Sequence, residues 1–144
     1  DNEPWLSSAL SRVHAAVTVA RDAGIPDERL ILLGFSQGAC LTLDYVAAAA
    51  SNGARFGGVA ALAGALVGDP AVPREAVGRL HDTPVLLACG DADSHIPAPL
   101  VRRSAEHFTA LGASVDLRLY GGVGHDIIAD EIEAVQAMVA ALPV

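Results

Sequence analysis

The sequence predicts an α/β fold with one parallel sheet of about four strands and helices on both of its faces. Three observations support this prediction: apolar runs of strand length, helical periodicity between them, and glycine or proline residues at their boundaries. Strands that are apolar on both faces are typical of the interior of a parallel sheet. Strict alternation of strands and helices favours the same class, because each helix returns the chain to the same end of the sheet by a right-handed crossover.

The N-terminal part is expected to contain two helices and two strands. Between Pro4 and Gly24, apolar residues recur at helical spacing and predict the first helix (Leu6, Leu10, Val13, Val17, Ala20). The continuous apolar run at residues 30–35 predicts a buried strand, and residues 37–50 predict the second helix. Residues 56–62 form the next apolar run and predict the second strand.

The C-terminal part is expected to continue the alternation. After a stretch rich in glycine and proline, residues 74–80 predict a short helix and residues 84–89 a third strand. Residues 101–111 predict another helix. Residues 115–120 alternate between apolar and polar side chains, which is typical of a half-exposed edge strand. The last helix is expected over residues 128–142.

The amino-acid composition and net charge exclude some classes of function. The 144 residues fit one domain, and the 52% hydrophobic content supplies material for a core. The net charge of −8 argues against a nucleic-acid partner, because phosphate binding requires a basic surface. No unbroken apolar stretch approaches the ~18 residues of a membrane span. Cys40 and Cys89 could pair in a disulfide, but reduced buried thiols are favoured in a chain with this much core, and they indicate a cytoplasmic location.

The motif Gly34-Phe35-Ser36-Gln37-Gly38 lies between a predicted buried strand and a predicted helix. In this context a G-x-S-x-G motif is typical of a nucleophile elbow, which is a sharp strand-to-helix turn. Ser36 is expected to take a strained backbone conformation there, with Gly34 and Gly38 removing side chains that would clash. The hydroxyl then stands above the sheet, and the backbone N–H of Gln37 points at a developing oxyanion. The alternative is an ordinary glycine-rich turn with a capping serine.

A nucleophilic serine needs a histidine base and a carboxylate, and two later loops at predicted strand ends contain both. The loop after the third strand contains Asp91 and Asp93, and the loop after the fourth contains His125. Serine, aspartate and histidine therefore follow one another in the order expected of an α/β-hydrolase fold. Such loop residues also occur as plain turn formers, and Asp91 is a candidate for that role.

Three motifs together resemble the phospholipase/carboxylesterase family, whose relatives include acyl-protein thioesterases and dienelactone hydrolases. The motifs are Leu33–Ala39, Gly90–Pro97 and Tyr120–His125. The resemblance runs through essentially the whole chain and implies the α/β-hydrolase fold, with Ser36 as nucleophile and His125 as base. It implies Asp93 rather than Asp91 as the acid, because the acid is the fourth residue of the family's G-x-x-D-x-x-[VI]-P motif.

The sequence differs from the family pattern at its N-terminal end. Members of the family begin with several more strands and a His-Gly loop that supplies the second oxyanion donor, and this sequence contains no His-Gly dipeptide. Residue 1 is Asp rather than Met, so the true N-terminus is expected elsewhere. Residues 1–144 are therefore expected to be the C-terminal portion of a single α/β-hydrolase domain. The strand at residues 30–35 would then expose an edge, which favours homodimerisation or other self-association.

The expected function is hydrolysis of small-molecule carboxylic esters through an acyl-enzyme intermediate, without a cofactor. The alternatives are an acyl thioesterase with the same triad and a non-catalytic fragment that retains only the fold. No metal is expected, because His14, His81 and His107 lack the spacing of metal ligands. His95 is interpreted either as a pocket residue or as a turn or packing residue. Residues 62–66 are either a wall of the acyl pocket or part of the core.

Overall fold

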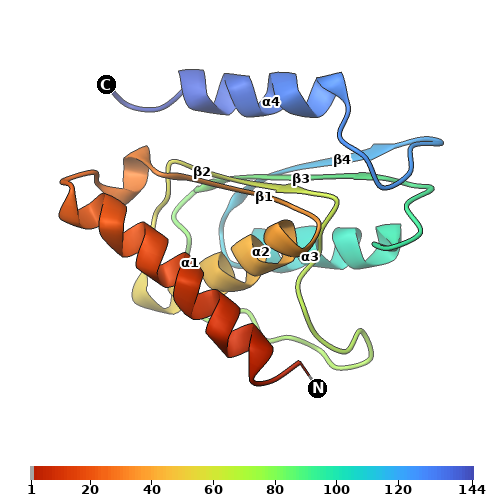
Figure 1. Cartoon of the computed structure of the whole chain (residues 1–144), viewed down its shortest axis with the longest axis horizontal. Helices are drawn as coiled ribbons and strands as arrows, with labels where there is room; N and C mark the ends of the chain where they lie inside the picture. Colours follow the sequence, from red (N-terminus) through yellow and green to blue (C-terminus); the bar gives the residue numbers. More distant parts are fainter. Residues whose placement is uncertain (1) are drawn as a thin grey trace.

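A parallel four-stranded sheet forms the centre of the computed structural model, which describes residues 2–144 (Figure 1). The strands are β1 (Ile31–Phe35), β2 (Gly58–Leu62), β3 (Pro84–Gly90) and β4 (Ser114–Tyr120). The helices are α1 (Trp5–Asp22), α2 (Gln37–Ala49), α3 (Ala98–Ala110) and α4 (Ala129–Ala140), with 3-10 turns η1 (Asp27–Arg29) and η2 (Ala50–Asn52). The strands lie in chain order, and each neighbouring pair is parallel, which confirms the predicted class.

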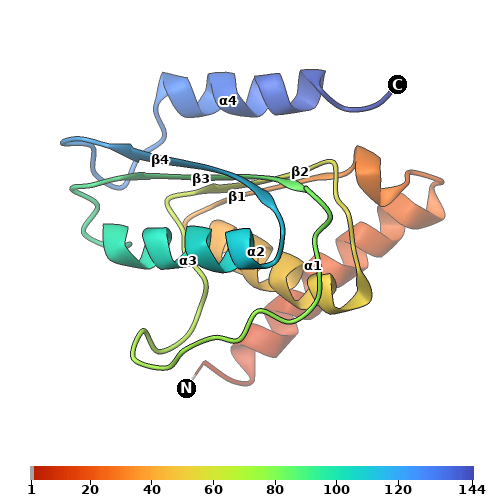
Figure 2. The ribbon, with the colours of Figure 1, turned by 180° about the vertical axis from the view of Figure 1, so that it is seen from behind.

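Helices cover both faces of the sheet, as predicted. The helices α1, α2 and α3 lie on one face, and α4 lies on the other (Figures 1 and 2). α2 packs on β1 and β2, α3 packs on β3 and β4, and α1 packs on α2. The register pairs Phe35 with Leu62 and Gly90 with Tyr120, so the carboxyl ends of the strands meet at one end of the sheet. The loops that leave these strand ends therefore lie close together.

The core is divided unequally between the two faces. The larger cluster fills the space between the sheet and α1–α3 and contains Leu43, Phe56, Leu87 and Phe108, all of which are almost completely buried. The smaller cluster lies under α4 and consists mainly of side chains from β2 and β3. Burial on both faces explains why these two strands are apolar along their whole length.

The expected helix at residues 74–80 is wrong. Residues 63–83 contain no helix or strand, and they cross the α1–α3 side of the sheet as an irregular connection (Figures 1 and 2). Tertiary contacts hold this segment. The Arg74 guanidinium binds the buried carboxylate of Asp44 on α2, whose other oxygen accepts the Val67 N–H. The N–H groups of Arg79 and Leu80 donate to carbonyl oxygens of other elements, which replace the hydrogen bonds of a helix.

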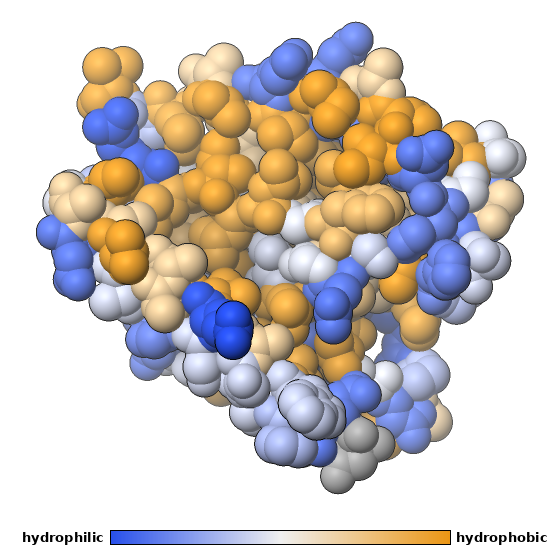
Figure 3. Space-filling model, viewed as in Figure 1, coloured by the Kyte–Doolittle hydropathy of each residue, from blue (hydrophilic) through white to orange (hydrophobic). Residues whose placement is uncertain are grey.

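Both outer strands expose part of their surface. Among the described strands, β4 pairs with β3 alone and is half-exposed, which confirms the predicted edge strand. Within residues 2–144, β1 pairs only with β2, and Leu33 and Phe35 on it are 54% and 38% exposed. The space-filling view shows apolar side chains gathered over the region of β1, below α4 (Figure 3). A free, apolar strand edge of this kind is a site for pairing with another chain.

Both cysteines are free thiols; Cys89 is buried in β3 and Cys40 is half-buried on α2. Of the helices in the described part of the chain, none combines the length and the apolar character that crossing a membrane requires.

Candidate active site

Ser36 occupies the turn between β1 and α2. Its φ of 53° lies in the left-handed region, which is rare for a residue with a side chain and indicates local strain. A hydrogen bond of 2.9 Å from the Ser36 N–H to the Leu62 carbonyl ties the turn to β2. A Cβ at Gly34 would lie 2.2 Å from the Gly38 backbone, so the sharp turn requires glycine at position 34. At Gly38 a Cβ would meet nothing within 4 Å, so the expected steric reason applies to Gly34 and not to Gly38.

His125 lies in the loop between β4 and α4 and contacts both other members of the expected triad. Its Nε2 atom is 2.9 Å from Ser36 Oγ, and its Nδ1 atom is 2.7 Å from Asp93 Oδ2. The three side chains come from three different strand ends, which the parallel sheet brings together. The structure therefore joins all three residues that the sequence singled out in one chain of hydrogen bonds.

The Asp93 carboxylate is fully buried and is stabilised as an anion. Its Oδ1 atom accepts the backbone N–H groups of His95 at 2.7 Å and Ile96 at 2.9 Å, while Oδ2 accepts from His125. Burial by itself raises the pKa of a carboxyl group, but these hydrogen bonds and the charge of His125 outweigh it and lower the Asp93 pKa to about 2. A permanently charged carboxylate is suited to orienting an imidazole and stabilising its protonated form.

Asp91 has a different partner, which separates the two candidate acids. Its Oδ1 atom accepts the backbone N–H of Gly122 at 2.7 Å, and no hydrogen bond links it to His125. The backbones of the two loops also meet, because the Ala92 N–H donates to the Val123 carbonyl at 3.0 Å. Asp91 is therefore more than a turn former: it joins the loop of Asp93 to the loop of His125.

Two buried groups beneath Asp93 and His125 are not indicated as part of the site by the sequence analysis. The Cys89 thiol donates to Asp93 Oδ2 at 3.6 Å, and its burial, together with the charges of Asp93 and Glu131, raises its pKa to about 12. Glu131, in the first turn of α4, accepts the Ile128 N–H at 2.8 Å, and burial raises its pKa. The spacing of Glu131 three residues after Ile128 is the available sequence signal, since a glutamate at the third helical position typically caps the helix start.

Two aromatic rings flank the His125 imidazole. The Phe35 ring centroid lies 5.0 Å from that of His125, and the His95 ring centroid lies 4.7 Å from it. His95 therefore contacts the imidazole itself, which the sequence left undecided. Neither contact was predictable from spacing, because the residues are 90 and 30 positions from His125 in the chain.

Gln37 is the first residue of α2, directly after Ser36. Its backbone N–H belongs to the first turn of the helix, whose N–H groups have no carbonyl partner inside the helix. The positive end of the helix dipole adds to the attraction for an anion at this place. The position of Gln37 therefore suits the expected oxyanion donor.

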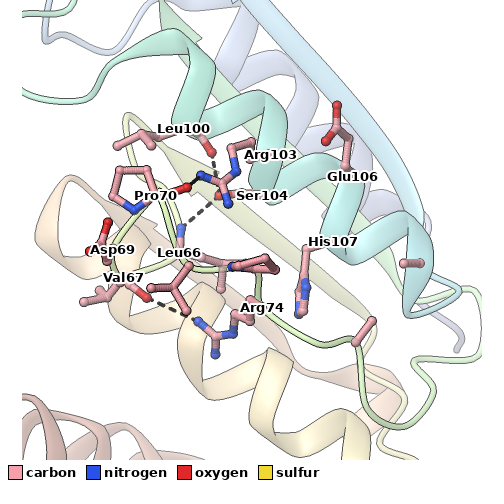
Figure 4. Close-up of a pocket in the computed structure, with 15 residues that line it drawn as sticks. Leu66, Val67, Asp69, Pro70, Arg74, Leu100, Arg103, Ser104, Glu106 and His107 are labelled. Carbon is pink, nitrogen blue, oxygen red and sulfur yellow. Dashed lines mark hydrogen bonds between the residues drawn. The ribbon is translucent and has the colours of Figure 1, made fainter.

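A cavity of about 580 Å³ lies between residues 66–76 and α3 (Figure 4). Its lining does not include Ser36, Asp93 or His125. Among the residues that line it are Leu66, Pro70, Arg74, Leu100, Arg103 and His107. Ala63 and Ala65 are buried, and a Cβ on Gly64 would meet Ala39 of α2. Residues 62–66 therefore pack largely as core behind the turn that carries Ser36, with Leu66 reaching the cavity.

The chain is similar to known proteins along almost its whole length. A family model described as Phospholipase/Carboxylesterase matches residues 1–142. An acyl-protein thioesterase 1 from Gibberella zeae is 31% identical over 129 residues, which are 86% of this chain and 52% of that protein. The acyl-protein thioesterase 1 of Saccharomyces cerevisiae is 27% identical over 136 residues, 92% of this chain and 58% of that protein.

Solved structures agree with the sequence comparison. A crystal structure of a phospholipase/carboxylesterase from Dyadobacter fermentans superposes with a TM-score of 0.86 at 36% identity, covering 96% of this chain and 65% of that chain. This chain thus spans about half the length of the curated relatives it matches.

Proposed function

Because the chain belongs to the Phospholipase/Carboxylesterase family, we propose that it carries the catalytic triad of a serine hydrolase that cleaves carboxylic esters. The observation that supports this most directly is the chain of hydrogen bonds from Ser36 Oγ through His125 to Asp93, at 2.9 and 2.7 Å. Nucleophile, base and orienting acid in this order are what acyl transfer requires at neutral pH.

In the proposed mechanism, His125 Nε2 takes the proton of Ser36 as Oγ attacks the ester carbonyl carbon. The tetrahedral intermediate places a negative charge on the former carbonyl oxygen, and the Gln37 N–H donates a hydrogen bond to it. Asp93 holds the imidazole with Nδ1 protonated and stabilises the imidazolium that forms. His125 then protonates the leaving alcohol, and the acyl-enzyme is hydrolysed by a water molecule that His125 activates.

A thioesterase is the second candidate, and the names of the acyl-protein thioesterase relatives favour it. The same three residues would attack a thioester carbonyl, so the site does not distinguish the two substrates. Rates on matched ester and thioester pairs with one acyl group decide between them. A non-catalytic fragment is the third candidate; the missing His-Gly dipeptide, and with it the second oxyanion donor, is the feature in its favour.

We also propose that residues 1–144 form the C-terminal portion of a single domain of this family, in line with the 52–65% coverage of relatives and the free edge of β1. A small-molecule ester is the proposed partner, and the net charge of −8 disfavours nucleic acid. The free thiols of Cys40 and Cys89 suit a cytoplasmic location.

The experiment uses a fluorophosphonate probe, which reacts with activated serines. We expect labelling and short-chain ester hydrolysis in the unaltered protein and the loss of both in Ser36→Ala. Ser51→Ala is the matched control, because Ser51 is exposed and its hydroxyl donates to the Ala48 carbonyl. Unchanged ester turnover in Ser36→Ala refutes the proposed function.

A further inference from the structure

His95 lies against the proposed base without belonging to the triad. Its ring centroid is 4.7 Å from that of His125, with the two planes inclined by 59°. Its backbone N–H donates to Asp93 Oδ1 at 2.7 Å, and Asp93 Oδ2 accepts from His125. One buried carboxylate therefore fixes the backbone of His95 and the ring of His125 relative to each other. Unlike Asp93, His95 is exposed to solvent.

The surroundings of the His125 ring contain few charges. Asp93 faces Nδ1, Ser36 faces Nε2, and the apolar Phe35 ring lies 5.0 Å away. Four further titratable groups lie around the site: Asp126 is exposed on the same loop, and Asp91 binds the Gly122 N–H at the loop start. The other two are the buried Cys89, whose thiol donates to Asp93, and the buried Glu131 of α4. Of the side chains in residues 2–144 that contact the His125 ring, namely Phe35, Ser36, Asp93 and His95, His95 is the one that can become a cation.

We propose that His95 is a positioning residue whose charge tunes the protonation of His125 and thereby sets the lower pH limit of ester hydrolysis. The pH limit rests on the proposed function, whereas the coupling between the two rings does not. Two positive charges at the observed separation repel each other even in water. In a medium of high dielectric constant, this repulsion moves a titration midpoint by about 0.6 pH unit and weakens with added salt.

The effect has two parts with opposite consequences. A cation at position 95 disfavours the protonated form of His125, so the base remains neutral and functional to a lower pH. The same cation opposes the imidazolium that forms in the transition state, so the rate at the pH plateau falls. The acid limb of the profile and its plateau should therefore move together when the charge at this position changes.

The test compares variants that differ in charge at position 95, and kcat/KM for ester hydrolysis is measured in each as a function of pH at low ionic strength. His95→Phe keeps an aromatic ring but removes the charge, and His95→Arg carries a permanent charge on a planar group that stacks on aromatic rings. We expect the acid-limb midpoint to be highest in His95→Phe, intermediate in the unaltered protein and lowest in His95→Arg. The two extremes should differ by about 0.6 pH unit, and the plateau of His95→Arg should be about fourfold lower than that of His95→Phe.

His14 supplies the matched control, because it is exposed on α1 and its ring contacts Tyr45 rather than the triad. His14→Phe and His14→Arg change charge equally and should leave the midpoint in place. High salt should shrink the difference within the His95 series. The proposal is overturned if the acid-limb midpoints of His95→Phe and His95→Arg coincide. Equal losses of rate in these two variants, with no shift of the midpoint, would indicate that His95 has a packing role instead.

An NMR titration of the His125 ring in the same variants requires no turnover. If the titration midpoint of His125 shifts between the variants but the protein has no Ser36-dependent activity, the coupling between the rings is supported and the proposed function is refuted. An unshifted midpoint in active protein would overturn the coupling and leave the function intact.

Discussion

Asp91 Oδ1 accepts the backbone N–H of Gly122 at 2.7 Å, and this bond joins the loop that carries Asp93 to the loop that carries His125. Two aspartates separated by one residue thus have distinct partners: Asp93 contacts the imidazole, and Asp91 contacts the backbone of the loop that presents it. The two carboxylates can therefore be tested separately, by the same chemical change at each position.

Asp93→Asn should lower kcat by about 10⁴-fold. The asparagine oxygen can still accept the two backbone N–H groups, but its NH₂ group would then face His125 Nδ1 and favour the wrong tautomer. Asp91→Asn should cost less than about tenfold, because the amide oxygen still accepts from Gly122. Steady-state kinetics on one ester substrate compares the two variants. A greater loss in Asp91→Asn would show that the acid is misassigned.

Gly90→Ala should misplace His125. A Cβ at Gly90 would lie 1.9 Å from the Val123 carbonyl oxygen, so the loop of His125 must move away. A displacement of about 1 Å between catalytic groups costs on the order of 100-fold in rate. Gly124→Ala is the control in the same loop, because its Cβ would meet nothing within 4 Å. The rate of fluorophosphonate labelling is measured in both variants. Equal labelling rates in Gly90→Ala and Gly124→Ala would contradict the steric explanation.

Asp93 should make the free energy of unfolding depend on pH at the acid end. Its pKa is lowered from the ordinary 3.8 to about 2, so its stabilising contribution is complete above 3.8 and is lost as pH falls through about 2. This contribution is on the order of 2 kcal/mol. The difference in unfolding free energy between the unaltered protein and Asp93→Asn should shrink by that amount from about pH 5 to about pH 2.

Urea unfolding at several pH values measures this difference, with Asp22→Asn as the control, since Asp22 is exposed at the end of α1. A constant difference across the acid range would show that Asp93 is not stabilised as an anion.

The chain of residues 1–144, expressed alone, should self-associate through β1. In the part of the chain that the structure describes, this strand pairs with β2 only, and Leu33 on its surface is 54% exposed. Leu33→Lys should reduce association, because a charged side chain on an edge strand opposes pairing with another chain. Val19→Lys, at a 69% exposed position on α1, is the matched control and should have little effect. Size-exclusion chromatography with light scattering gives the masses. A monodisperse monomer of the unaltered chain would refute this prediction.

Much of the fold was predictable from local patterns. Each strand begins and ends within about two residues of its predicted range, because strand period, turn residues and apolar runs are properties of short segments. The expected helix at residues 74–80 failed for the opposite reason. Residues far away in the chain hold this segment: Asp44 binds Arg74 from 30 residues away, and the N–H groups of Arg79 and Leu80 bind the carbonyls of Ala50 and Leu111. A local pattern contains no information about such contacts.

The sequence by itself determined the positions of Ser36, Asp93 and His125, since each lies in a motif at the end of a predicted strand. Only the tertiary structure decided how they meet: Asp91 ties the two loops together through Gly122, Gly90 allows these loops to touch, and His95 lies against the imidazole. The physical reason is that hydrogen bonds and ring contacts depend on distances of a few ångströms between segments far apart in the chain. Sequence spacing constrains which strand end a residue occupies, but not those distances.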